Sequence, residues 1–125
     1  MSISMIGIDY NTANISTREV FAWTVEKQND VMDVFKKVKG INGCIVLSTC
    51  NRTEIWASCE DSYDNLYNTL CKCLCIDKET YKSLFILRKD FESIKHLFRL
   101  ACGLESKIMG EDQILTQIKD ALVLA

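Results

Sequence analysis

The order of apolar patterns along this chain predicts an α+β fold, namely a ferredoxin-like split βαβ antiparallel sheet with helices on one face. Strand-like and helix-like stretches alternate as strand, helix, strand, strand, helix, strand, and two more helical patterns follow at the C-terminal end. The 125 residues include no proline, which suits one domain without a proline-rich linker. We expect the ferredoxin-like part to cover about residues 1–90 and the additional helices about 91–125.

The first third of the chain supplies a strand and two helices. The apolar run in "SISMIGIDY" fits a buried strand over about residues 3–9. A short helical stretch follows, in which Ser16 is the expected N-cap because Glu19 stands three residues later, the spacing of a capping box. A longer helix is predicted over 25–39, where apolar residues recur at helical spacing: Val31, Val34, Phe35 and Val38.

The middle of the chain predicts a strand pair, a helix and a last strand. "CIVLST" and "TEIWASC" are separated by little more than Cys50, Asn51 and Arg52. In the second stretch apolar and polar residues alternate, as in a strand with one buried face. "DSYDNLYNTLCKCLCI" then predicts a helix, "DKETYKSL" a short helix or turn, and "FILRK" the last strand. "DFESIKHLFRLACGL" and the C-terminal stretch predict the additional helices.

Composition excludes several classes of function. The net charge of −2 provides no global basic field for nucleic acid or acidic membranes. No apolar stretch has the length of a membrane span, and neither standard nucleotide-binding loop occurs. The seven cysteines are an odd number and no signal peptide precedes them, which favours reduced thiols and a cytoplasmic location. The chain stops within an amphipathic helical pattern, so we expect it to be a fragment of a longer protein.

Cys50 and Arg52 are the first candidates for chemistry. A thiolate at a tight turn can attack an acyl group, with backbone N–H groups holding the developing oxyanion, and a nearby cation lowers a thiol pKa. The planar fork of Arg52 suits a substrate carboxylate. The alternatives are a small buried cysteine and an arginine that is solvated or paired with Glu54.

His96 is the only histidine, and it lies on the flank of the apolar arc of its predicted helix. That arc comprises Phe91, Ile94, Leu97, Phe98, Ala101 and Leu104. The position argues against a packed core histidine and leaves a surface residue as the alternative to a functional one.

Two further groups have a functional and a structural interpretation. Cys71, Cys73 and Cys75 lack the paired spacing of zinc sites, so we expect packing and no metal. In "GLESKIMGEDQILTQIK", Gln113 and Gln117 form a polar stripe that is either solvated or directed into a cleft.

Three blocks together resemble the N-terminal catalytic domain of glutamyl-tRNA reductases: "GIDYNTANISTRE", "STCNRTEIW" and "HLFRLACGLESKIMGEDQILTQIKDA". They follow the order of that family and span nearly the whole chain. The first block departs from the family at Tyr10, where a histidine is common. The family continues into an NADPH-binding domain and a dimerisation domain, and neither is present in these 125 residues.

The resemblance implies an enzyme in which the Cys50 thiolate attacks glutamyl-tRNA(Glu), expels the tRNA and forms a thioester. Hydride from NADPH, bound outside this chain, then gives glutamate-1-semialdehyde for 5-aminolevulinate and tetrapyrrole synthesis. The fragment alone would form the thioester without reducing it. His96 matches a histidine that either transfers a proton or positions the ester. The implied substrate-binding residues are Thr49, Cys50, Asn51, Arg52, Ser106, Glu111, Asp112, Gln113 and Gln117.

The resemblance also implies partners, namely glutamyl-tRNA(Glu), a second copy of the full-length chain in a homodimer, and glutamate-1-semialdehyde aminomutase as the next enzyme, with no membrane. The alternative function is a docking module for tRNA or protein in which Cys50 is inert.

Overall fold

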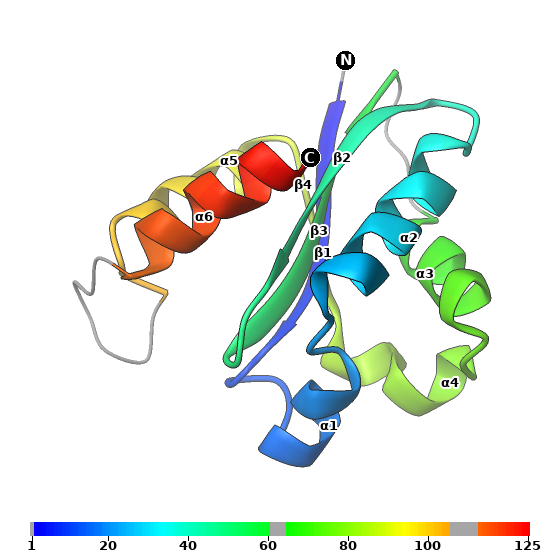
Figure 1. Cartoon of the computed structure of the whole chain (residues 1–125), viewed down its shortest axis with the longest axis horizontal. Coiled ribbons are helices and arrows are strands. Elements are labelled where there is room, and N and C mark those ends of the chain that lie inside the picture. Colours follow the sequence, from blue (N-terminus) through cyan, green and yellow to red (C-terminus); the bar gives the residue numbers. More distant parts are fainter. Residues whose placement is uncertain (1, 61–64, 106–112) are drawn as a thin grey trace.

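The centre of the computed structural model is a four-stranded antiparallel sheet (Figure 1). The structure describes residues 2–60, 65–105 and 113–125. The four expected strands are confirmed, and their spatial order is β2-β3-β1-β4. All neighbouring pairs run antiparallel. The strands are β1 (Ser2–Asp9), β2 (Ile41–Ser48), β3 (Arg52–Cys59) and β4 (Ile86–Lys89).

The helices follow the expected order as well. They are α1 (Ile15–Val20), α2 (Val25–Lys36), α3 (Leu66–Leu74), α4 (Lys78–Tyr81), the 3₁₀ turn η1 (Lys82–Leu84), α5 (Phe91–Ala101) and α6 (Gln113–Leu124). The long N-terminal helix ends at Lys36, three residues earlier than expected, and a turn in which Gly40 has a φ of 94° then leads into β2.

Helices cover both faces of the sheet. Figure 1 shows α2 and α3 on one face and α5 and α6 on the other. On the first face, α2 and α3 bury Val31, Phe35 and Leu70 against strand residues such as Ile6 and Ile55. On the second face, Leu47 of β2 packs with Leu100 of α5 and Ala121 of α6. The expectation of helices on one face therefore describes only the part before α5, and the C-terminal helices form a third layer.

A smaller apolar cluster lies between β1, α1 and the α4 region. Ile8, Ala13 and Phe21 are its buried members. The ring of Phe21 meets those of Phe85 and Tyr81 edge to face, with centroids 5.1 and 5.2 Å apart. The backbone carbonyl of Phe21 also accepts hydrogen bonds from Ser48 Oγ and Thr53 Oγ1, so the segment after α1 connects this cluster with the end of the β2–β3 hairpin.

The expected N-cap of α1 is wrong. Asn14, not Ser16, accepts a hydrogen bond from the backbone N–H of Thr17, at 2.9 Å. Asparagine is as good an N-cap as serine, and a helix that begins at Ile15 places Ser16 inside its first turn. Glu19 then lies too far along the helix to complete a capping box.

This correction predicts a difference between two alanine substitutions. We expect Asn14→Ala to lower the free energy of unfolding by about 1 kcal/mol, because it removes the acceptor for an otherwise unpaired N–H. Ser16→Ala is the matched control and should be neutral, since alanine suits a helix interior. Urea denaturation followed by circular dichroism measures both. Equal losses for the two variants would contradict the cap at Asn14.

The orientation of α5 also differs from the expected one. Its buried residues are Ser93, His96 and Leu100, whereas Phe91 and Phe98 are 72% and 68% exposed. The helical wheel predicted that the apolar arc faces the core. A wheel is built from the helix sequence alone and does not include the surface that the helix packs against. That surface includes the carbonyl of Ile3, which accepts from Ser93 Oγ at 3.3 Å, and the carboxylate of Glu54. Polar groups of the sheet therefore determine which face of α5 is buried.

Candidate functional site

The turn between β2 and β3 presents a cysteine to solvent. Thr49 closes the turn: its backbone N–H donates to the carbonyl of Arg52 at 2.8 Å. The Thr49 hydroxyl accepts from the backbone N–H groups of Asn51 and Arg52, both at 3.2 Å. Cys50 lies at the tip and is exposed. The threonine thus stabilises the turn that holds the thiol outside the sheet.

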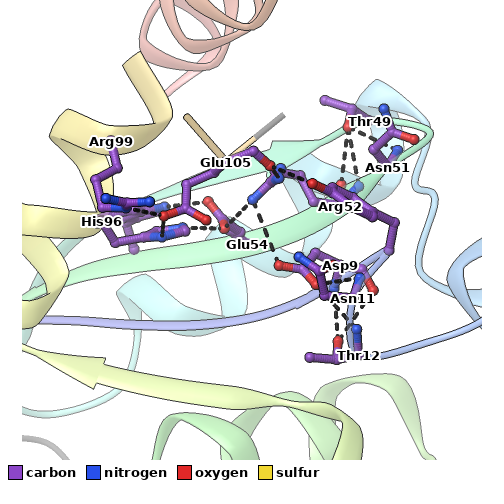
Figure 2. Close-up of polar contacts among 12 residues, drawn as sticks. Asp9, Asn11, Thr12, Thr49, Asn51, Arg52, Glu54, His96, Arg99 and Glu105 are labelled. Atoms are coloured by element: carbon purple, nitrogen blue, oxygen red, sulfur yellow. Dashed lines mark hydrogen bonds and ion pairs between the residues drawn. The ribbon is translucent and has the colours of Figure 1, made fainter. Parts of the chain in front are cut away.

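Arg52 points the other way, into the protein, and is only 2% exposed. Figure 2 shows its guanidinium among acidic and carbonyl oxygens. Nη1 lies 3.3 Å from Glu54 Oε2 and 3.9 Å from Asp9 Oδ2. Nη2 donates to the backbone carbonyl of Glu105. The pairing with Glu54 considered from sequence is confirmed, while a solvated turn arginine is wrong.

Glu54 is the centre of the buried network. One carboxylate oxygen accepts from His96 Nε2 at 2.6 Å, and the other accepts from Trp56 Nε1 at 3.3 Å. Gly7 is its partner across β1 and β3. A Cβ at position 7 would lie 2.9 Å from Glu54 Cγ, so glycine is required for this side chain to keep its place. The sheet register and one glycine therefore fix the carboxylate.

The charge state of Glu54 follows from two opposing effects. Burial raises the pKa of the Glu54 carboxyl group. This effect is outweighed by three partners that lower the pKa: His96 through its hydrogen bond and charge, Arg52 through its charge, and Trp56 through its hydrogen bond. The net effect lowers the pKa of Glu54, so the group is a carboxylate at neutral pH. Since a carboxylate only accepts, Nε2 of His96 carries a proton.

His96 is not a surface residue, which corrects that expectation from the helical wheel. It is 3% exposed and its ring stacks on Trp56 with centroids 5.8 Å apart. Its Nδ1 atom is buried and has no hydrogen-bond partner among the residues that the structure describes. The ring of His96 is thus held by the carboxylate of Glu54 and the indole ring of Trp56.

The loop after α5 reaches the same network. The Tyr10 hydroxyl donates to the carbonyl of Glu105 at 3.3 Å, and Arg99 Nε donates to its carboxylate at 2.6 Å. Residues 10, 52 and 105 therefore meet at one carbonyl, although they are far apart in sequence. This contact accounts for a tyrosine at position 10 in this chain.

The other expected site residues lie partly beyond what is described. Ser106, Glu111 and Asp112 fall outside the described residues, and Gln113 is the first residue of α6. Gln117 is half-buried and borders a hollow of about 380 Å³ together with Ser48, the last residue of β2. The structure thus brings Gln117 near the end of β2 that leads into the cysteine turn.

The cysteines of the Cys71-x-Cys73-x-Cys75 stretch differ in exposure. Cys71 is buried, Cys73 half-buried and Cys75 exposed. Within the described ranges, no cluster of three or more histidine, cysteine or acidic side chains is placed to hold a metal ion. No helix in the described part of the chain is long and apolar enough to cross a membrane.

Sequence reasoning named Glu54 only as an alternative partner of Arg52, and it missed Asp9 and Glu105 as members of the network. In the alternating pattern of β3, Glu54 is one of the polar residues, and these were expected to face solvent. Helices instead cover both faces of β3, so Glu54 is buried. The pairing of Glu54 with Gly7 across the two central strands could have indicated a buried side chain at position 54. That pairing can be recognised only when the strand register is known. Asp9 and Glu105 come from distant segments, and only the tertiary contacts reveal them.

The described residues combine an exposed cysteine at the β2–β3 turn with a buried network of Arg52, Glu54 and His96 on an α+β scaffold. Comparison with known families then assigns the chain to one of them. The model of the family "Glutamyl-tRNAGlu reductase, N-terminal domain" matches residues 6–125. The chain belongs to this family.

Relatives and a solved structure agree with that assignment. Glutamyl-tRNA reductases of Acetivibrio thermocellus and Alkaliphilus oremlandii are each 43% identical over 126 aligned residues, which cover all of this chain and 38% of each relative. The structure of the glutamyl-tRNA reductase from Methanopyrus kandleri has a TM-score of 0.75 and 28% identity, covering 98% of this chain and 28% of that one. The chain thus spans well under half the length of these relatives.

Proposed function

We propose that this chain is the acyl-accepting domain of a glutamyl-tRNA reductase, with Cys50 as its nucleophile. The observation that carries the proposal is the contrast between Cys50 and Arg52, two residues apart. The thiol is exposed at the tip of a rigid turn, whereas the guanidinium enters the buried network of Glu54 and His96. Exposure is the first requirement for a thiol that accepts an acyl group.

The proposed reaction begins with glutamate esterified through its α-carboxyl to the 3′ end of tRNA(Glu). The Cys50 thiolate attacks the ester carbon, a C–S bond forms, and the bond from carbon to the ribose oxygen breaks. The released oxygen takes a proton, for which Nδ1 of His96 is the available donor because Nε2 is held by Glu54. NADPH, bound outside these 125 residues, supplies the hydride that reduces the thioester to glutamate-1-semialdehyde.

Arg52 is proposed to bind the free γ-carboxylate of the glutamyl group. Its guanidinium already lies among oxygen acceptors, and the 3.9 Å separation from Asp9 is the weakest of these contacts. A substrate carboxylate would exchange with Asp9 or with the carbonyl of Glu105. Thr49 and Asn51 shape the turn beside it, and Ser106, Glu111, Asp112, Gln113 and Gln117 complete the proposed substrate site by resemblance.

Several broader features belong to the same proposal. The full-length protein would be a cytoplasmic homodimer of 5-aminolevulinate synthesis that passes its product to glutamate-1-semialdehyde aminomutase. All seven cysteines are unpaired, which supports a reducing compartment. The order β2-β3-β1-β4, with the first and third strands central, supports a ferredoxin-like classification of about residues 1–90.

The proposal is tested by incubating the chain with glutamyl-tRNA(Glu) and measuring its intact mass under acidic quench. We expect one glutamyl group per chain in the wild type and none in Cys50→Ser. Cys75→Ser is the matched control, because it removes an exposed thiol outside the site, and it should label normally. Uptake that persists in Cys50→Ser, or that spreads over several thiols, would instead indicate a docking module with an inert cysteine.

A further inference from the structure

We propose that Glu105 is a positioning residue that keeps a proton on Nδ1 of His96, and that Arg99 controls how strongly it does so. This inference rests on the proposed function for its catalytic meaning, but its geometry is independent of the substrate. No part of the sequence reasoning assigned a role to either residue. Arg99 lies in the last turn of α5, and Glu105 lies in the loop after it, where its backbone carbonyl contacts Arg52 and Tyr10.

The first observation is an unpaired atom. Within residues 2–60, 65–105 and 113–125, Nδ1 of His96 is buried without a hydrogen-bond partner. The carboxylate of Glu105 faces it, with Oε1 4.0 Å from Nδ1. That distance is about 1 Å longer than a hydrogen bond, so a small side-chain shift would close it. An anion next to an unpaired ring nitrogen favours the protonated form of that nitrogen.

The second observation is competition for the same oxygen. Arg99 Nε lies 2.6 Å from Oε1 of Glu105, the atom that faces His96. The side chain of Arg99 is 47% exposed, whereas that of Glu105 is 21% exposed. An arginine open to solvent therefore holds the carboxylate away from the imidazole. Any contact that draws Arg99 away would release Glu105 toward Nδ1.

The backbone explains why Glu105 stands there. Gly103 has a φ of 76°, a conformation that favours glycine, and it ends α5 by turning the chain back. The N–H of Leu104 donates to the carbonyl of Arg99 at 2.9 Å within this turn. Residue 105 is thereby returned over the last turns of α5, where its carboxylate meets Arg99 and His96.

The charged groups near His96 that the structure describes form ion pairs on both sides of its ring. From β3, Glu54 holds Nε2 at 2.6 Å, and Arg52 acts through Glu54. From the loop, Glu105 is the acidic group on the Nδ1 side among the described residues, and Arg99 of α5 pairs with it. Glu54 therefore fixes one nitrogen, while Glu105 sets the charge at the nitrogen proposed to serve the leaving oxygen.

The test uses the single histidine of the chain, whose ring ¹⁵N signals need no further assignment. We expect Glu105→Gln to move the Nδ1 signal toward that of a bare nitrogen, with little change at Nε2. Arg99→Met should move the Nδ1 signal in the opposite direction, because it frees the carboxylate of Glu105 and removes the positive charge of Arg99. Glu105→Asp should restore part of the wild-type signal. Glu92→Gln, the same change at an exposed site on α5, is the control and should leave both signals in place.

Single-turnover acylation of Cys50 supplies the second readout. Glu105→Gln should slow it by about tenfold, since the protonated donor is less populated, while Glu92→Gln keeps the wild-type rate. An unchanged Nδ1 signal in Glu105→Gln, or shifts of the same sign in Glu105→Gln and Arg99→Met, would overturn the inference. If wild-type Cys50 takes up no glutamyl group while the opposite shifts appear, the proposed function fails and the role of Glu105 stands.

Discussion

Replacement of Phe21 by alanine is expected to lower the free energy of unfolding by about 4 kcal/mol, the largest effect of any single substitution considered for this chain. The ring is completely buried and contacts Phe85 and Tyr81 edge to face. Its removal leaves a cavity among three segments, which cannot all move inward to fill it. Urea denaturation followed by fluorescence or circular dichroism gives the difference in stability.

Phe98→Ala is the matched control, because the same atoms are removed from a ring that is 68% exposed. We expect its effect to stay within about 0.5 kcal/mol. A loss for Phe98→Ala as large as that for Phe21→Ala would show that α5 buries its apolar arc after all. Phe21 also matters for the site, since its carbonyl accepts from Thr53 Oγ1 at 2.6 Å, one residue after Arg52.

Glu54→Gln is expected to lower the free energy of unfolding by about 3 kcal/mol at neutral pH. The substitution keeps the shape of the side chain but leaves the buried guanidinium of Arg52 and the imidazole of His96 without their shared anion. Breaking one member of a buried ion pair is costly because the remaining charge stays desolvated. Glu60→Gln, at the exposed residue that follows β3, is the control and should be nearly neutral.

The pH dependence of this effect has a definite sign. Folding lowers the pKa of Glu54 below its usual value of 4.5. The stabilisation from its carboxylate is therefore fully present above pH 4.5 and is lost as the pH falls through the lower, folded-state pKa. We expect the difference between wild type and Glu54→Gln to shrink as the pH falls below 4.5. A difference that grows on acidification would contradict the assignment of Glu54 as a buried carboxylate.

The sequence alone determined the order of the elements and the position of the short turn at Cys50, whereas the exposure of its thiol came from the structure. Apolar periodicity identified all four strands, because period-2 and period-3.6 patterns follow directly from backbone geometry. The short break at Cys50, Asn51 and Arg52 between two strand-like runs predicted a tight turn. The family resemblance rested on the same residues, and the match over residues 6–125 bears it out. Each of these conclusions depends on neighbours in the chain.

The tertiary structure alone decided which side chains surround Arg52 and His96. Asp9, Glu54 and Glu105 come from two strands and a loop, and they meet only because β1 pairs with β3 and α5 packs across both. The orientation of α5 was likewise settled by the carboxylate beneath it, since a wheel records apolar residues but not the surface they would face. Local pattern thus specifies elements, whereas desolvation and charge pairing between distant segments specify the site.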